Sequence, residues 1–159
     1  MKIESLIIKA LGIVVPWTLR WYYTPKRISA LIDVTIPSTG DGFTYNGASG
    51  KAVCWLEITN RSPFDFIADR ILIDINMNGN CGTMFQIIPT QIKAGCKERM
   101  FASVDSIAVA AHSIQQLRNE PKVWLTVHAV LQCKVRDFVY YSSINDLRNM
   151  RIFNLAVQS

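Results

Sequence analysis

A two-residue alternation of apolar and polar side chains constrains the fold of this chain more than any other feature of its sequence. The alternation is cleanest over residues 70–78, where one face carries Ile71, Ile73, Ile75 and Met77. Because successive side chains of a strand point to opposite sides, this spacing predicts strands with one buried and one solvated face. The same period predicts further strands over residues 28–36, 52–59, 83–88, 97–104, 122–134 and 137–144.

Turn-forming residues separate these predicted strands. The run Asn78-Gly79-Asn80 indicates a tight hairpin turn. Residues 38–50 are rich in glycine, serine and threonine and predict a loop or a loose hairpin. One helix interrupts the strands over residues 105–119, and Asp105 or Ser106 is expected to cap it.

About seven short strands separated by turns are typical of an antiparallel sandwich. The length of 159 residues suits one domain, and a hydrophobic fraction of 50% supplies a core. We therefore predict a mainly β, immunoglobulin-like antiparallel β-sandwich over residues 28–159, with one short helix. The tail, residues 145–159, fits either a short helix or an edge strand.

The first 27 residues differ from the rest of the chain in charge and in hydrophobicity. They carry five basic side chains against Glu4 alone, a net charge of +4, whereas the other 132 residues hold 12 basic and 11 acidic side chains. Residues 1–27 are predicted to form an apolar, basic helix with an aromatic end. The residues expected to contact a membrane or a partner are Leu6, Ile7, Leu11, Val14, Val15, Trp17, Arg20, Trp21, Tyr22, Tyr23, Lys26 and Arg27.

This N-terminal helix has three interpretations. Bulky Pro16-Trp17 stands where a secretory signal needs small residues, and Lys9 interrupts an apolar run that is short for a bilayer. The helix fits a membrane interface, with its aromatic side chains at headgroup level and its cations on anionic lipid. It also fits burial by a partner protein or a homo-oligomer, or packing on its own domain. Its positive charge predicts a cytoplasmic, membrane-associated body.

The sequence contains no recognisable catalytic or metal-binding motif. The cysteines are expected to be free thiols in a reducing compartment: Cys54, Cys81, Cys96 and Cys133. The two histidines, His112 and His128, lack the spacing of a metal site. Cys133 and His128 lie on opposite faces of one predicted strand, so they do not form a nucleophile pair. We therefore expect no enzymatic activity, no metal and no cofactor.

Calcium and nucleic acid are weaker interpretations. Asp65, Asp69 and Asp74 do not have the spacing of a calcium-binding loop. The aromatic and basic residues near the N-terminus could stack single-stranded bases. A nucleic-acid-binding domain normally carries its positive charge on the folded body, and this body is nearly neutral. The charge distribution therefore argues against a nucleic-acid partner.

Three short runs resemble the late-embryogenesis-abundant family, also described as the water-stress and hypersensitive-response domain. The runs are Leu56 to Phe64 (LEITNRSPF), Asn76 to Gly79 (NMNG) and Ile92 to Gly95 (IKAG). Arg61 stands where the family usually has a proline after the asparagine. The resemblance spans roughly residues 28–144 and implies a two-sheet fold, often tethered to a membrane at its N-terminus. It also implies protective, stress-related or defence-related roles and brings no catalytic residues.

The sequence therefore predicts a non-catalytic binding or scaffolding β-sandwich that its N-terminal segment tethers to a membrane surface. The alternative is a soluble subunit of a multi-protein or homo-oligomeric assembly, in which neighbouring subunits bury the N-terminal helix.

Overall fold

The computed structural model describes residues 16–86, 88–145, 147 and 149–155, and most of them lie in one curled, mixed sheet. Its strands are β1 (Ile32–Thr35), β2 (Phe43–Asn46), β3 (Lys51–Asn60), β4 (Phe66–Met77), β5 (Asn80–Gln86), β6 (Thr90–Ile92), β7 (Lys97–Val104), β8 (Val123–Gln132), β9 (Phe138–Ile144) and β10 (Met150–Phe153). Their order is β10-β2-β3-β7-β5-β4-β8-β9, with β1 also paired to β3 and β6 to β4. The chain is thus mainly β, as the alternation predicted.

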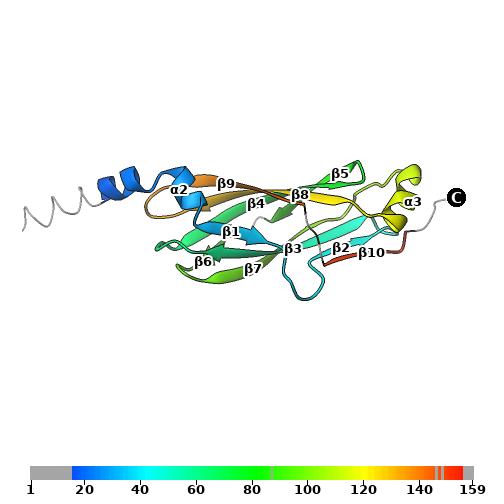
Figure 1. Ribbon diagram of the computed structural model, residues 1–159, viewed down its shortest axis with the longest axis horizontal. Coiled ribbons are helices and arrows are strands. Elements are labelled where there is room, and N and C mark those ends of the chain that lie inside the picture. The colour runs from blue at the N-terminus through cyan, green and yellow to red at the C-terminus, as the bar shows by residue number, and fades with distance from the viewer. Residues whose placement is uncertain (1–15, 87, 146, 148, 156–159) are drawn as a thin grey trace, which may run out of the picture.

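The sheet curls so that two groups of strands face each other across the core (Figure 1). One group contains β3 and β7, and the other contains β4, β8 and β9. The groups are joined within the sheet by a single pair between β5 and β7, Phe85 with Ser103. Inward side chains from both groups form one buried cluster that includes Leu56, Ile73 and Val127, each at most 1% exposed.

The clearest sequence patterns correspond to observed strands. The predicted inward faces of β3, β4 and β8 are buried along their whole length. The Asn-Gly turn joins β4 to β5, with positive φ at Asn78 (47°) and Gly79 (89°). The described part of the tail forms an edge strand, β10, which pairs in parallel with β2. The expectation of a purely antiparallel fold is therefore wrong at this pair.

The first predicted strand is shorter than its pattern indicated. Residues 28–36 were expected to be extended, but Ile28 lies in the short helix α2 (Pro25–Ser29). Thr24 caps this helix by accepting a hydrogen bond from the Arg27 N–H at 3.4 Å, and Pro25 presets its first turn. Ile28 is still fully buried, so its apolar character contributes to the core from a helix instead of a strand.

The predicted helix also begins later than its pattern indicated. Helix α3 covers Ala111–Asn119, and neither Asp105 nor Ser106 caps it. The Ile107 N–H donates to the carbonyl of Gly50 at 2.8 Å, and Ile107 is buried. The Ile107 carbonyl accepts from the Tyr45 hydroxyl, and the Ala110 N–H donates to Asn80 Oδ1. A helix that began at residue 105 or 106 would need both groups for its own first turns, so these long-range bonds delay its start. Strand β6 lies outside the predictions. Of the two alternatives for residues 38–50, the loose hairpin is the one observed, because β2 pairs antiparallel with β3.

Candidate interaction surface at the N-terminal end

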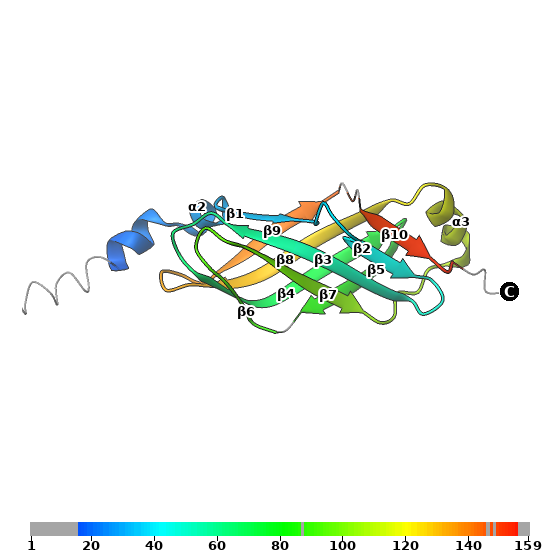
Figure 2. The same ribbon diagram turned by 90° about the horizontal axis from the view of Figure 1, so that it is seen from below.

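A helical stretch at residues 16–22 projects from one end of the sheet, and α3 lies at the opposite end (Figures 1 and 2). Trp17 and Trp21 are four residues apart, so they share one helix face. Trp17 is 68% exposed, Trp21 75% and Tyr22 54%. Large aromatic side chains with this exposure mark a surface that is suited to a partner or to a membrane interface.

The helical stretch is held on the body by contacts that are distant in sequence. The Arg20 Nε donates to the carbonyl of Val135 at 3.0 Å, and the Arg136 Nη2 donates back to the carbonyl of Arg20 at 3.2 Å. The ring of Tyr23 meets Phe64 edge to face, with 4.8 Å between centroids. Residues 20–23 therefore contact the β8–β9 turn and the loop after β3.

Basic residues accompany the exposed aromatic side chains at this end of the molecule. The Arg27 guanidinium lies 4.8 Å from the centroid of the Tyr22 ring and donates to the Tyr22 carbonyl at 3.0 Å. Lys26 is exposed, as is Lys134 in the β8–β9 turn, and neither forms an ion pair with a carboxylate of the described residues. We call this surface the basic end and define it as Trp17, Arg20, Trp21, Tyr22, Lys26, Arg27, Lys134 and Arg136. Asp137 is the acidic residue in the same turn.

Some of the predicted contact residues lie outside the described residues: Leu6, Ile7, Leu11, Val14 and Val15. Trp17, Arg20, Trp21, Tyr22, Lys26 and Arg27 gather at the basic end.

Tyr23 behaves differently from the other predicted contact residues, because it is half-buried against the core. Sequence reasoning missed Lys134 and Arg136. Both flank a predicted turn, but their approach to Arg20 spans more than a hundred residues of sequence. No local pattern contains that information.

Within the described part of the chain, no helix is long and apolar enough to cross a bilayer.

All four cysteines are free in the structure. Cys54 is fully buried in β3, and desolvation raises the pKa of its thiol to about 12. Because the thiolate is the nucleophile, this thiol is inert at ordinary pH. Cys81 and Cys96 are exposed. Cys133 is half-buried and donates from its Sγ to the carbonyl of Arg136 at 3.1 Å.

The histidine and the aspartates considered above take part in separate contacts. His128 Nε2 lies 3.3 Å from an oxygen of Asp74, which also accepts a hydrogen bond from Thr83 at 2.8 Å. Asp65 accepts a hydrogen bond from the N–H of Ala94 at 2.9 Å. Across residues 16–155 as described, no three His, Cys, Asp or Glu side chains are grouped to hold a metal ion.

A hollow of about 520 Å³ lies at the α3 end, opposite the basic end. It is lined by the glycine turn after β2, by Ile107 and by Ile114. The Tyr45 hydroxyl in its wall is buried and donates to the carbonyl of Ile107 at 2.9 Å. Burial raises the pKa of the Tyr45 phenol. The hydroxyl therefore has a structural role, because it links β2 to the segment before α3.

No protein-family model matches the chain, and no curated protein matches it. Among solved structures, a protein from Arabidopsis thaliana is similar with a TM-score of 0.50 and 13% identity, over 77% of this chain and 79% of that chain. A second solution structure, described as "a putative late embryogenesis abundant (LEA) protein", has a TM-score of 0.49 and 9% identity over 90% of this chain and 86% of its own.

The sporulation control protein Spo0M from Bacillus subtilis is a third similar structure. It has a TM-score of 0.35 and 10% identity, over 72% of this chain and 47% of its own. Because the Arabidopsis thaliana protein shares only 13% of its residues with this chain, the similarity concerns the fold alone.

Proposed function

We propose that this chain is a non-catalytic binding or scaffolding protein that docks end-on onto an anionic membrane surface through its basic end. One observation carries the proposal. Three aromatic side chains that are more than half exposed, Trp17, Trp21 and Tyr22, lie beside several cations on a helix that is braced against the body.

The chemistry of the basic end fits lipid headgroups. Tryptophan and tyrosine favour the membrane–water interface because one part of each ring is apolar and the other part is polar. The anionic lipids of a cytoplasmic leaflet attract basic residues by about 1 kcal/mol per Lys or Arg near the surface. The five cations of the basic end, set against Asp137, favour such a leaflet. The proposal therefore places the body on the cytoplasmic side.

We also propose that the curled sheet is an immunoglobulin-like sandwich of the late-embryogenesis-abundant kind. Support comes from the LEITNRSPF run, in which Asn60 is 1% exposed and organises the loop after β3. The similar fold of the Arabidopsis thaliana protein is compatible with this proposal. A stress-related or defence-related role rests on the sequence resemblance alone.

Vesicle flotation tests the membrane contact on the full chain. We expect flotation with vesicles of phosphatidylcholine and phosphatidylserine, little flotation with phosphatidylcholine alone, and weaker binding at high salt. The double variant W17S/W21S is expected to lose roughly tenfold or more in affinity, because two exposed indoles no longer enter the interface. The matched control is W124S, which removes a 43% exposed indole from β8.

Two results would contradict the membrane contact. One is binding that does not depend on anionic lipid, and the other is equal binding by W17S/W21S and W124S. Light scattering of the same variants addresses the alternative. A full chain that forms lipid-independent assemblies, which W17S/W21S dissociates, would identify the basic end as a subunit interface.

A further inference from the structure

Strand β9 is an edge strand whose outer side has no backbone partner in the described residues. It forms the end of the sheet and pairs with β8 over all seven of its residues, without a register shift. No described residue outside β8 makes a backbone hydrogen bond to it. Its outward N–H and C=O groups are therefore available to another extended chain.

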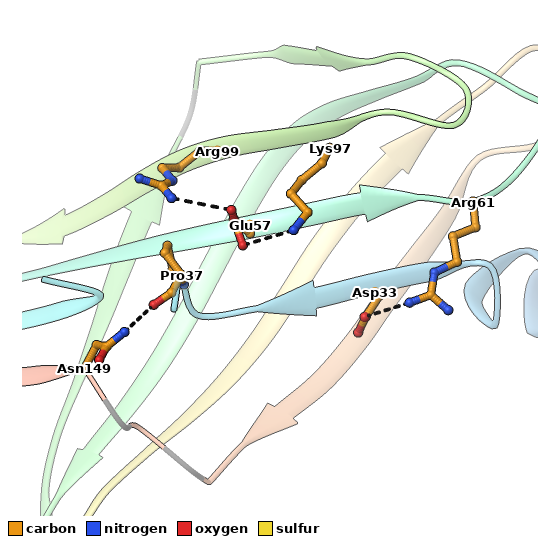
Figure 3. Close-up of polar contacts among 7 residues, drawn as sticks. All are labelled: Asp33, Pro37, Glu57, Arg61, Lys97, Arg99 and Asn149. Atoms are coloured by element: carbon orange, nitrogen blue, oxygen red, sulfur yellow. Dashed lines mark hydrogen bonds and ion pairs between the residues drawn. The ribbon is translucent and has the colours of Figure 1, made fainter. Parts of the chain in front are cut away.

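The sequence of β9, FVYYSSI, has none of the features that normally protect an edge. It contains no charged residue, no proline and no glycine. The outer strand β6 has only three residues, and the outer strands β1 and β10 have four residues each and carry a charge. In β1, Asp33 forms an ion pair with Arg61 at 3.3 Å (Figure 3), and in β10, Arg151 pairs with Asp41 at 3.2 Å. Folded proteins use short or charged edges to prevent pairing between molecules, so among these outer strands β9 stands out as both long and uncharged.

The second half of β9 is the accessible half. Helix α2 lies near β9, and both lie on the same side of the molecule as β1 (Figure 2). Ser142, Ser143 and Ile144 border a groove of about 460 Å³, whose other wall is formed by residues 33–38. Tyr141, at the start of this half, is 64% exposed. The unpaired backbone, an exposed apolar ring and the groove thus coincide at residues 141–144.

We propose that a second copy of this chain pairs with β9 at residues 141–144, so that two sheets become one continuous sheet. The pairing is antiparallel about a two-fold axis at Ser142, because directly opposed residues of an antiparallel pair point to the same face of the sheet. Ser142 then faces Ser142 of the other copy, and Tyr141 faces Ser143. Because β9 carries no charge, this register places no like charges opposite each other.

A second copy also fits the edge better than an unlimited stack of chains. A two-fold contact uses the same patch on both molecules and closes after two copies, which leaves no further β9 edge exposed. The paired segment lies within the seven residues of β9, so the interface belongs to the small, weak class. We therefore expect dissociation on dilution.

Sedimentation of the full chain without lipid tests the dimer, over about 10 µM to about 1 mM. The apparent mass is expected to rise from 18.0 kDa towards twice that value. The variant Y141K/S143K places two cations on each side of the axis and is expected to remain monomeric. The control I67K/I88K adds the same charge at exposed positions outside β9 and is expected to dimerise like the parent chain.

Two further measurements separate this dimer from any association through the basic end. The variant W17S/W21S is expected to dimerise as the parent chain does, since β9 is unchanged in it. Amide hydrogen exchange is expected to slow at residues 141–144 as concentration rises, while amides of β1 and β10 keep their rates. The proposal is overturned if the parent chain is monomeric throughout, if Y141K/S143K dimerises equally, or if W17S/W21S abolishes the dimer. Circular dichroism confirms that each variant is folded.

Discussion

Asn60 is the buried polar residue on which the loop after β3 depends. Its Nδ2 donates to the carbonyls of Phe64 at 2.7 Å, Lys93 at 3.1 Å and Ile92 at 3.3 Å. Its Oδ1 accepts hydrogen bonds from the N–H of Ser62 at 2.9 Å and from the Ser62 hydroxyl at 2.7 Å. One side chain therefore joins the end of β3 to the loop that carries Phe64, which is the residue that supports Tyr23 at the basic end.

Replacing this residue, Asn60→Ala, is expected to lower the free energy of unfolding by about 2–3 kcal/mol, because buried carbonyls and the Ser62 donors lose their partner. Urea denaturation measures the change. The control is Asn119→Ala, at the exposed end of α3, which is expected to change stability by less than about 0.5 kcal/mol. Equal midpoints for the two variants would show that the Asn60 network contributes nothing.

At the scale of elements, α3 begins without a side-chain cap. Ala110 occupies the cap position with φ −63° and ψ 142°, and no side chain accepts from the first turn. Its own N–H is already bonded to Asn80 at 3.0 Å, and its side chain is exposed. A hydroxyl could therefore be added there without disturbing a buried contact.

The variant Ala110→Ser is expected to raise the free energy of unfolding by about 0.5–1 kcal/mol, because the hydroxyl accepts an N–H that has no partner in the helix. Thermal denaturation measures the gain. Ala108→Ser serves as the control, since Ala108 is exposed in the same loop but lies outside the cap. If A108S stabilises the chain as much as A110S, the gain does not come from capping.

Strands with a complete alternation could be predicted from the sequence, and elements defined by distant contacts could not. β4 and β8 bury one face along their whole length, so their period is visible locally. β6 has three residues, too few to show a period. Helix α3 was placed too early because Tyr45 and Asn80, which are distant in sequence, bind the Ile107 carbonyl and the Ala110 N–H. The parallel pairing of β10 with β2 is non-local in the same way.

The candidate site follows the same rule at the scale of the whole molecule. Composition alone identified the aromatic and basic residues before Ile28, because they stand out locally. The support that Val135 and Arg136 give to Arg20 could not be predicted, since it joins opposite parts of the chain. The body is elongated (Figure 1), and the exposed aromatic and basic residues lie at one of its ends.

The stable body is expected to begin within the basic segment, because Ile28 is fully buried and Tyr23 packs on Phe64. A chain that starts at residue 19 keeps Arg20, Tyr23 and Ile28 and should unfold at nearly the same urea concentration as the full chain. A chain that starts at residue 31 loses all three, and the loss of Ile28 alone should cost about 1.5–3 kcal/mol.

The chain that starts at residue 31 could fail to fold. The variant Ile28→Ala in the full chain then measures the contribution of Ile28, with an expected loss of about 2–4 kcal/mol in the free energy of unfolding, including the cavity. If both truncated chains and I28A were as stable as the full chain, residues 19–30 would contribute nothing to the stability of the core. A large loss for the second truncated chain and for I28A, with none for the first, would mean that Trp17 belongs to the projecting tip while Tyr23 and Ile28 belong to the core. In that case the surface that we propose to meet lipid is held by the fold itself, so its position relative to the sheet is fixed.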